Sequence, residues 1–91
     1  GGHYKETTTT ATIECTYENV PSDADCGYFL DEESNSTTAG ISMNHSLGNV
    51  EGKQVIPLSG LKPGKTYYYQ AYIKHDGKSY LGSEQSFKTK S

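Results

Sequence analysis

The chain is short, weakly acidic and poor in helix-forming residues. Its 91 residues are enough for one domain with a modest core, and eight tyrosines and ten glycines, beside one methionine and no tryptophan, favour strands over helices. A formal net charge of −3 argues against the basic surface that nucleic-acid binding requires, and no apolar run is long enough for a membrane span.

No signal peptide opens the sequence, so we interpret the chain as a piece of a longer protein. Gly1 and Gly2 are interpreted as a cloning remnant or a linker end. Residues 3–91 then form a single domain, which we expect to be a monomer.

Residues 11–17 show the two-residue period of a strand that buries one face. A turn follows over residues 19–25, where Pro21 interrupts a polar, Asp-containing stretch. The buried face of the strand is expected to comprise Ala11, Ile13, Cys15 and Tyr17.

The middle of the chain gives weaker signals. Cys26, Tyr28 and Leu30 share one face of a predicted strand, and the polar residues 31–40 predict an exposed loop. Ile41, Met43 and Leu47 indicate a short strand or an edge segment within residues 41–53, where the pattern is least regular.

Residues 53–58 predict another brief strand. We place Val55 and Leu58 on one face of this strand. Pro57 lacks a backbone donor, so the strand is expected at a sheet edge or to end there.

The last third of the chain predicts a hairpin. Asp76 and Gly77 lie between two alternating runs, and such a pair favours the tight turn that joins antiparallel strands. On the first run the core face is predicted to hold Tyr67, Tyr69, Ala71 and Ile73, and the exposed face Tyr68, Gln70, Tyr72 and Lys74. The whole chain is thus predicted to form six or seven short strands, a number typical of a sandwich or a small barrel.

Residues 61–67 resemble the tyrosine corner of fibronectin type III domains. The resemblance implies that Leu61 caps the core, that Pro63 and Gly64 fix the turn, and that the Tyr67 hydroxyl bonds to backbone upstream. It therefore implies an all-β, seven-stranded antiparallel sandwich of the immunoglobulin-like, fibronectin type III-like class.

The same region is similar to one branch of that family, the modules of Bacteroidetes surface and secreted proteins. The similarity covers the tyrosine run, the Ala71-Tyr72 pair, Gly77 and the closing residues 86–89. It implies an extracellular, cell-surface or periplasmic location.

Cys15 and Cys26 both fall on predicted inner faces. If their strands face each other across the core, a disulfide is geometrically possible, and two buried thiols are the alternative. The sequence leaves both open.

The sequence contains no constellation that specifies a reaction or a cofactor. His3, His45 and His75 are far apart, and none has a second ligand at metal-binding spacing. No nucleophile elbow and no phosphate-binding glycine loop occurs. We therefore predict a protein that is not an enzyme, with no metal and no cofactor.

We consider two non-catalytic functions. The resemblance implies the first, in which the domain is a spacer or protein-interaction module of a larger secreted or cell-surface bacterial protein, with neighbouring domains of the same chain as its partners. In the second, exposed aromatic rings bind a glycan or a protein, because flat rings stack on sugars and form hot spots at interfaces. The candidate binding residues are Tyr68, Tyr72 and Tyr80, with His75 and Lys78 at the hairpin tip.

Overall fold

The computed structural model describes residues 2–34 and 43–91, and the side chains of residues 6–34 and 43–91. All regular structure in this part of the chain is β-strand. The strands are β1 (Gly2–Glu6), β2 (Ala11–Tyr17), β3 (Asp25–Asp31), β4 (Asn44–Gly48), β5 (Gly52–Leu58), β6 (Thr66–His75), β7 (Lys78–Leu81) and β8 (Gln85–Lys88).

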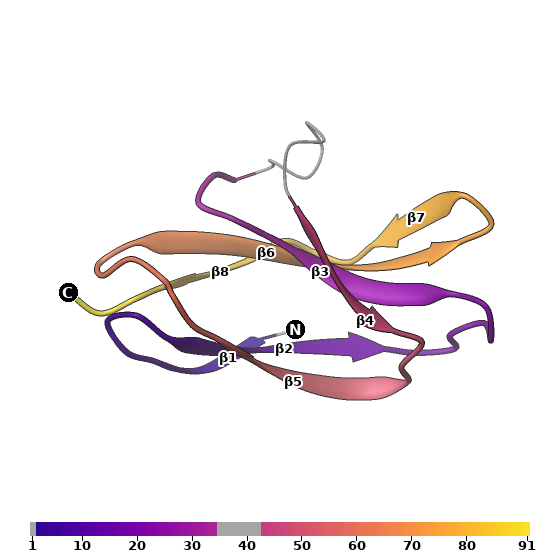
Figure 1. Ribbon diagram of the computed structural model, residues 1–91, viewed down its shortest axis with the longest axis horizontal. Helices are drawn as coiled ribbons and strands as arrows, with labels where there is room; N and C mark the ends of the chain where they lie inside the picture. The colour runs from indigo at the N-terminus through magenta and orange to yellow at the C-terminus, as the bar shows by residue number, and fades with distance from the viewer. Residues whose placement is uncertain (1, 35–42) are drawn as a thin grey trace.

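The strands form two antiparallel sheets that pack face to face (Figure 1). One sheet has three strands in the order β1-β2-β5, and the other has five, in the order β4-β3-β6-β7 with β8 also paired to β6. The predicted all-β sandwich is confirmed. In the constant immunoglobulin type the fourth strand joins the sheet of the first, second and fifth strands, whereas here β4 pairs with β3 in the other sheet.

The last predicted strand is divided into β7 and β8. Both pair with β6, but the three residues 82–84 lie opposite only two residues, Gln70 and Ala71. The Gly82 amide donates to the Ala71 carbonyl at 2.9 Å, and the Gln70 side chain donates to the Gly82 carbonyl at 2.6 Å. The extra residue between β7 and β8 resembles a β-bulge, which interrupts the hydrogen-bond ladder along β6.

The predicted inner face of β2 is confirmed, because all four of its inward side chains are at most 3% exposed. The placement of Val55 on the same face as Leu58 is wrong: Val55 is 53% exposed, whereas Ile56 and Leu58 are buried. Residues 55 and 58 are three apart and cannot share a face of a strand whose period is two. Pro57 does lie on an edge strand, β5. Ile41 lies outside the described residues, and Met43 is exposed just before β4.

Tyr72 lies on the predicted outer face of β6, but the prediction that it is exposed is wrong, since its exposure is 1%. Its register partner on β3 is Gly27, and a Cβ atom at Gly27 would collide with the Tyr72 ring. The ring therefore covers the space that a side chain at Gly27 would take. It also packs on Phe29 at 4.9 Å between centroids, and its hydroxyl accepts a hydrogen bond from Asn44 at 3.0 Å.

Residues 61–67 form the expected corner. The Lys62 amide donates to the Tyr67 hydroxyl at 2.8 Å, and Leu61 is buried. Gly64 takes a φ of 61°, which favours glycine. The buried Thr89 hydroxyl, which the sequence did not point to, donates to the Lys62 carbonyl at 2.6 Å and accepts from the Lys65 amide at 2.9 Å.

Removing the Tyr67 hydroxyl tests the corner. We expect Tyr67→Phe to lower the free energy of unfolding by about 1–2 kcal/mol, because the Lys62 amide loses its partly buried acceptor. Urea denaturation measures this change. Tyr68→Phe is the matched control on the outer face and should change stability by less than about 0.5 kcal/mol. Equal losses in the two variants would contradict the role of the corner.

A methyl group at Gly27 tests the fit of the Tyr72 ring. We expect Gly27→Ala to cost about 3 kcal/mol, since its Cβ would collide with the ring and with the His45 carbonyl. In a Tyr72→Ala background the same substitution should cost less. Gly82→Ala is the control, because a Cβ there lies 3.9 Å from its nearest neighbour. If Gly27→Ala left the free energy of unfolding unchanged, the Tyr72 ring would be able to move away from this position.

Candidate functional site

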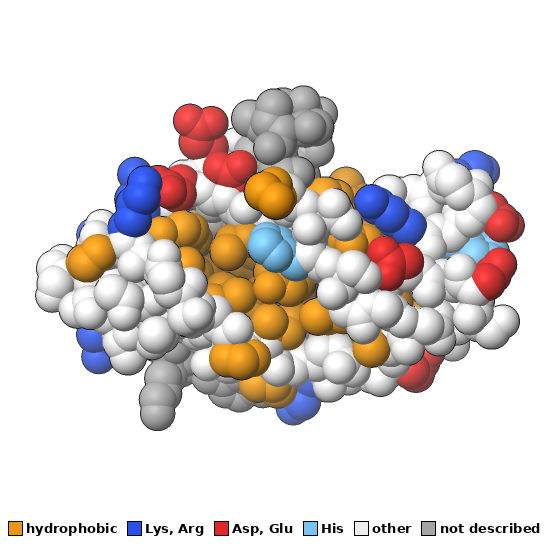
Figure 2. Space-filling view, viewed as in Figure 1, with side chains coloured by type: hydrophobic (Ala, Val, Ile, Leu, Met, Phe, Trp, Pro, Cys, Tyr) orange, Lys and Arg blue, Asp and Glu red, His pale blue; other side chains and the backbone are white. Residues whose placement is uncertain are grey.

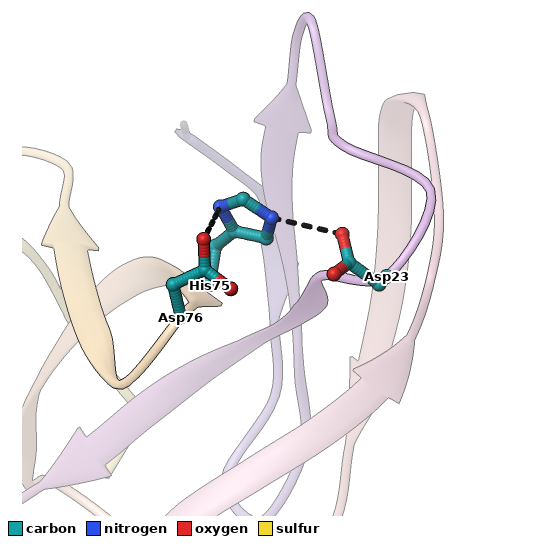
Figure 3. Close-up of side chains that lie close together, drawn as sticks. All are labelled: Asp23, His75 and Asp76. Carbon is teal, nitrogen blue, oxygen red and sulfur yellow. Dashed lines mark hydrogen bonds and ion pairs between the residues drawn. The ribbon is translucent and has the colours of Figure 1, made fainter.

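His75 lies between two carboxylates at the β6–β7 hairpin (Figure 3). Its Nε2 atom is 2.8 Å from Asp23 Oδ1, and its Nδ1 atom is 3.7 Å from Asp76 Oδ2. Asp76 and Gly77 form the predicted tight turn, with φ values of 52° and 75°. Asp23 belongs to the turn before β3 and approaches because Asp25 pairs with Lys74.

The sequence did not indicate this cluster, since Asp23 and His75 are 52 positions apart. The two carboxylates approach different ring nitrogens, on opposite sides of the imidazole (Figure 3). One ligand atom from each of Asp23, His75 and Asp76 lies within 4.8 Å of the others, so the three residues could offer ligands to a divalent ion. Exposed acidic groups with this spacing are nevertheless common in proteins that hold no ion. Both Asp side chains are at least 70% exposed. The cluster therefore acts as a surface clamp between the hairpin and the turn before β3.

The three candidate binding tyrosines, Tyr68, Tyr72 and Tyr80, do not share one exposed surface. Tyr80 is 56% exposed, but it pairs with Ile73 and so points to the opposite face of the sheet from Tyr68. Tyr72 is buried, and Tyr68 is half-buried. Lys78 is exposed and pairs with His75 at the hairpin tip.

A groove runs between β2 and the link from β7 to β8. We call it the β2–β7 groove. It consists of two adjoining pockets of about 180 and 140 Å³, which share Ala71 and Gly82. Neither pocket is lined by an acid, a histidine or a lysine. The first is lined by Tyr17, Ala71, Tyr72, Ile73, Tyr80, Leu81 and Gly82, and the second by Cys15, Thr16, Tyr69, Ala71, Gly82, Ser83 and Gln85.

A second hollow opens on the face seen in Figure 2, where hydrophobic side chains are visible between the sheets. A pocket of about 300 Å³ beside β4 is lined by Leu30, Asp31, Glu32, Met43, His45 and Tyr67. Lys62 and Lys65 lie 3.1 and 3.3 Å from the Glu32 carboxylate and lower its pKa. His45 stacks on Tyr28 at 4.8 Å. Glu32 and His45, which line this pocket, are thus already engaged in contacts with other side chains of the domain.

Cys15 and Cys26 are buried free thiols, so the structure follows the second of the two alternatives. Burial raises the pKa of the Cys15 thiol. The Cys26 thiol lies 3.6 Å from the Val50 carbonyl. Both thiols are buried, and inaccessible thiols are poor nucleophiles, so neither cysteine offers a reactive group.

Comparison with known proteins identifies the fold but no family. No protein-family model matches the sequence, and no curated protein does. The solution structure of the sensor domain of the anti-sigma factor RsgI4 in Pseudobacteroides cellulosolvens is similar, with a TM-score of 0.73 and 20% identity over 99% of this chain and 71% of that one. A shorter version of that sensor domain gives a TM-score of 0.72 and 21% identity, covering 99% and 89%. At this identity the similarity shows the fold alone. Within the described residues, no helix is long and apolar enough to cross a membrane.

Replacing the clamp histidine tests its structural role. We expect His75→Ala to lower stability by only about 0.5 kcal/mol, because the Asp23 and Asp76 carboxylates are exposed. Amide hydrogen exchange of residues 78–81 should nevertheless become faster, since the hairpin loses its tie to Asp23. Lys78→Ala, at the paired position, is the control that should leave exchange unchanged. Unaltered exchange in His75→Ala would exclude the clamp.

Proposed function

We propose that the chain is a fibronectin type III-like, non-catalytic module of a longer bacterial protein and that it binds a polypeptide partner outside the cytoplasm. The resemblance of residues 61–67 to the tyrosine corner supports the domain type, as does the hydrogen bond from Lys62 to Tyr67. The similar structures belong to sensor domains of an anti-sigma factor, which supports a sensing or interaction role.

The observation that carries this proposal is the exposed apolar edge of β7. Every residue of β7 is exposed, and Tyr80 and Leu81 are 56% and 46% exposed. An edge strand with unpaired backbone groups and apolar side chains is a ready surface for another chain. Tyrosine is also enriched among the residues that contribute most to protein interfaces.

Glycan binding through stacked rings is less well supported, because Tyr68 and Tyr80 lie on opposite faces and Tyr72 is buried.

Selection of peptides on the immobilised chain tests the proposal. We expect a phage-displayed library of random linear peptides to yield binders that lose at least about tenfold in affinity, ~1.4 kcal/mol, for the Tyr80→Ser/Leu81→Ser variant. Val55→Ser removes an equally exposed apolar residue from β5 and is the matched control. No enrichment of peptides, or binding that the β7 substitutions leave unchanged, would overturn the proposal.

A nuclear magnetic resonance titration with soluble cellulose, xylan and pectin fragments tests the alternative. We expect the signals of Tyr68, Tyr80, His75 and Lys78 to stay unmoved. Shifts that gather on these residues would favour the glycan-binding function instead.

A further inference from the structure

Three side chains that can ligate a metal ion meet beside the β6–β7 hairpin (Figure 3). They are Asp23, His75 and Asp76, and one ligand atom of each lies within 4.8 Å of the other two. Asp23 comes from the turn before β3, whereas His75 ends β6 and Asp76 begins the tight turn that follows. Two segments 52 positions apart thus bring an imidazole and two carboxylates to one place.

The backbone holds these donors in position without an ion. The pairing of Asp25 with Lys74 fixes the distance between the turn and the end of β6. Asp76 has a φ of 52°, a conformation that aspartate tolerates better than most residues, so the turn sets where its side chain starts. The His75 side chain is 26% exposed, whereas the Asp23 and Asp76 side chains are 70% and 78% exposed. The imidazole is therefore the fixed donor, and the two carboxylates can turn towards it.

The spacing of the donors is close to that around a bound ion. Nitrogen and oxygen ligands about 2.1 Å from a tetrahedral zinc ion are about 3.4 Å apart. Asp23 Oδ1 lies 2.8 Å from His75 Nε2, and Asp76 Oδ2 lies 3.7 Å from His75 Nδ1. One carboxylate must therefore turn towards the nitrogen that the other already contacts. Since no separation exceeds 4.8 Å, this carboxylate has to move by no more than about 1.4 Å, which rotation of an exposed aspartate allows.

The charges at the cluster favour a cation. Within the described residues, His75 is the ion-pair partner of both carboxylates, and no lysine lies within ion-pair distance of either. The imidazole carries a charge only when it is protonated. In its neutral form the cluster holds two negative charges and no positive one, so a divalent ion would balance both carboxylates.

We propose that Asp23, His75 and Asp76 form a binding site for a divalent transition-metal ion of the zinc class. Two exposed carboxylates alone would not distinguish this place from other acidic surfaces, but the imidazole adds a third donor of a different kind. A nitrogen ligand suits zinc, nickel and copper, whereas calcium takes oxygen ligands. Three protein ligands leave a coordination position open, as in zinc sites that keep a water molecule there. The site is independent of the proposed function, because it uses no residue of β7.

Binding of the ion would also affect the hairpin. Asp23 belongs to the turn before β3, and His75 and Asp76 belong to the hairpin, so the ion would link these two segments. Without an ion, the link is a hydrogen bond between exposed groups, which contributes little. Coordination by three side chains is a firmer link, so the ion would slow the local opening of β7.

Isothermal titration calorimetry of the chain with Zn²⁺ at neutral pH tests the site. We expect one ion per chain, with a dissociation constant in the micromolar range, weaker than that of structural zinc sites with four protein ligands. Asp23→Asn, His75→Ala and Asp76→Asn should each weaken binding at least about tenfold, because each removes a ligand or its charge. His3→Ala and His45→Ala remove the other two imidazoles and are the matched controls, which should bind as the unaltered chain does. Ca²⁺ should bind at least about tenfold more weakly than Zn²⁺.

Nuclear magnetic resonance of the labelled chain gives a second readout. We expect saturating Zn²⁺ to slow amide exchange in residues 78–81 of the unaltered chain and to leave it unchanged in His75→Ala. The three site variants change exposed or partly exposed side chains, so their melting temperatures should stay close to that of the unaltered chain. A loss of Zn²⁺ binding can then be attributed to the ligands and not to unfolding.

Several outcomes would overturn the inference. They are the absence of Zn²⁺ binding, equal binding by His75→Ala and the unaltered chain, and equal binding of Ca²⁺, which would indicate carboxylates alone. Binding that is lost only in His3→Ala would place the ion at the start of the chain instead. Unchanged exchange of residues 78–81 at saturating Zn²⁺ would show that the ion does not link the hairpin to the turn.

Discussion

The contact on which the rest of the sandwich depends is made at Gly27. From the inner side, the buried Tyr17 hydroxyl donates to the Gly27 carbonyl at 2.6 Å and so joins β2 of one sheet to β3 of the other. From the outer side, the Tyr72 ring covers the same residue. A side chain at this position would displace the ring, and loss of the hydroxyl would leave the carbonyl without this buried donor. The contact also fixes Tyr17, which lines the first pocket of the groove.

Local patterns predicted those features that depend on one strand or one turn. Alternation indicated the inner face of β2, and the Asp76-Gly77 pair indicated the hairpin. The same turn also determines that residue 80 pairs with residue 73, because a two-residue loop makes His75 and Lys78 partners. The turn alone is therefore enough to place Tyr80 on the opposite face from Tyr68. The turn does not predict the burial of Tyr72, because this burial depends on Gly27. Only the pairing of β3 with β6 brings Gly27 opposite Tyr72.

The candidate sites were beyond sequence reasoning for a related reason. The Asp23–His75 contact requires the same β3–β6 pairing, which no local signal encodes. The groove requires that the three residues 82–84 lie opposite only two residues of β6. No motif sets this excess. The small side chain of Ala71 is a visible signal, but it becomes informative only once the register shows what lies across from it.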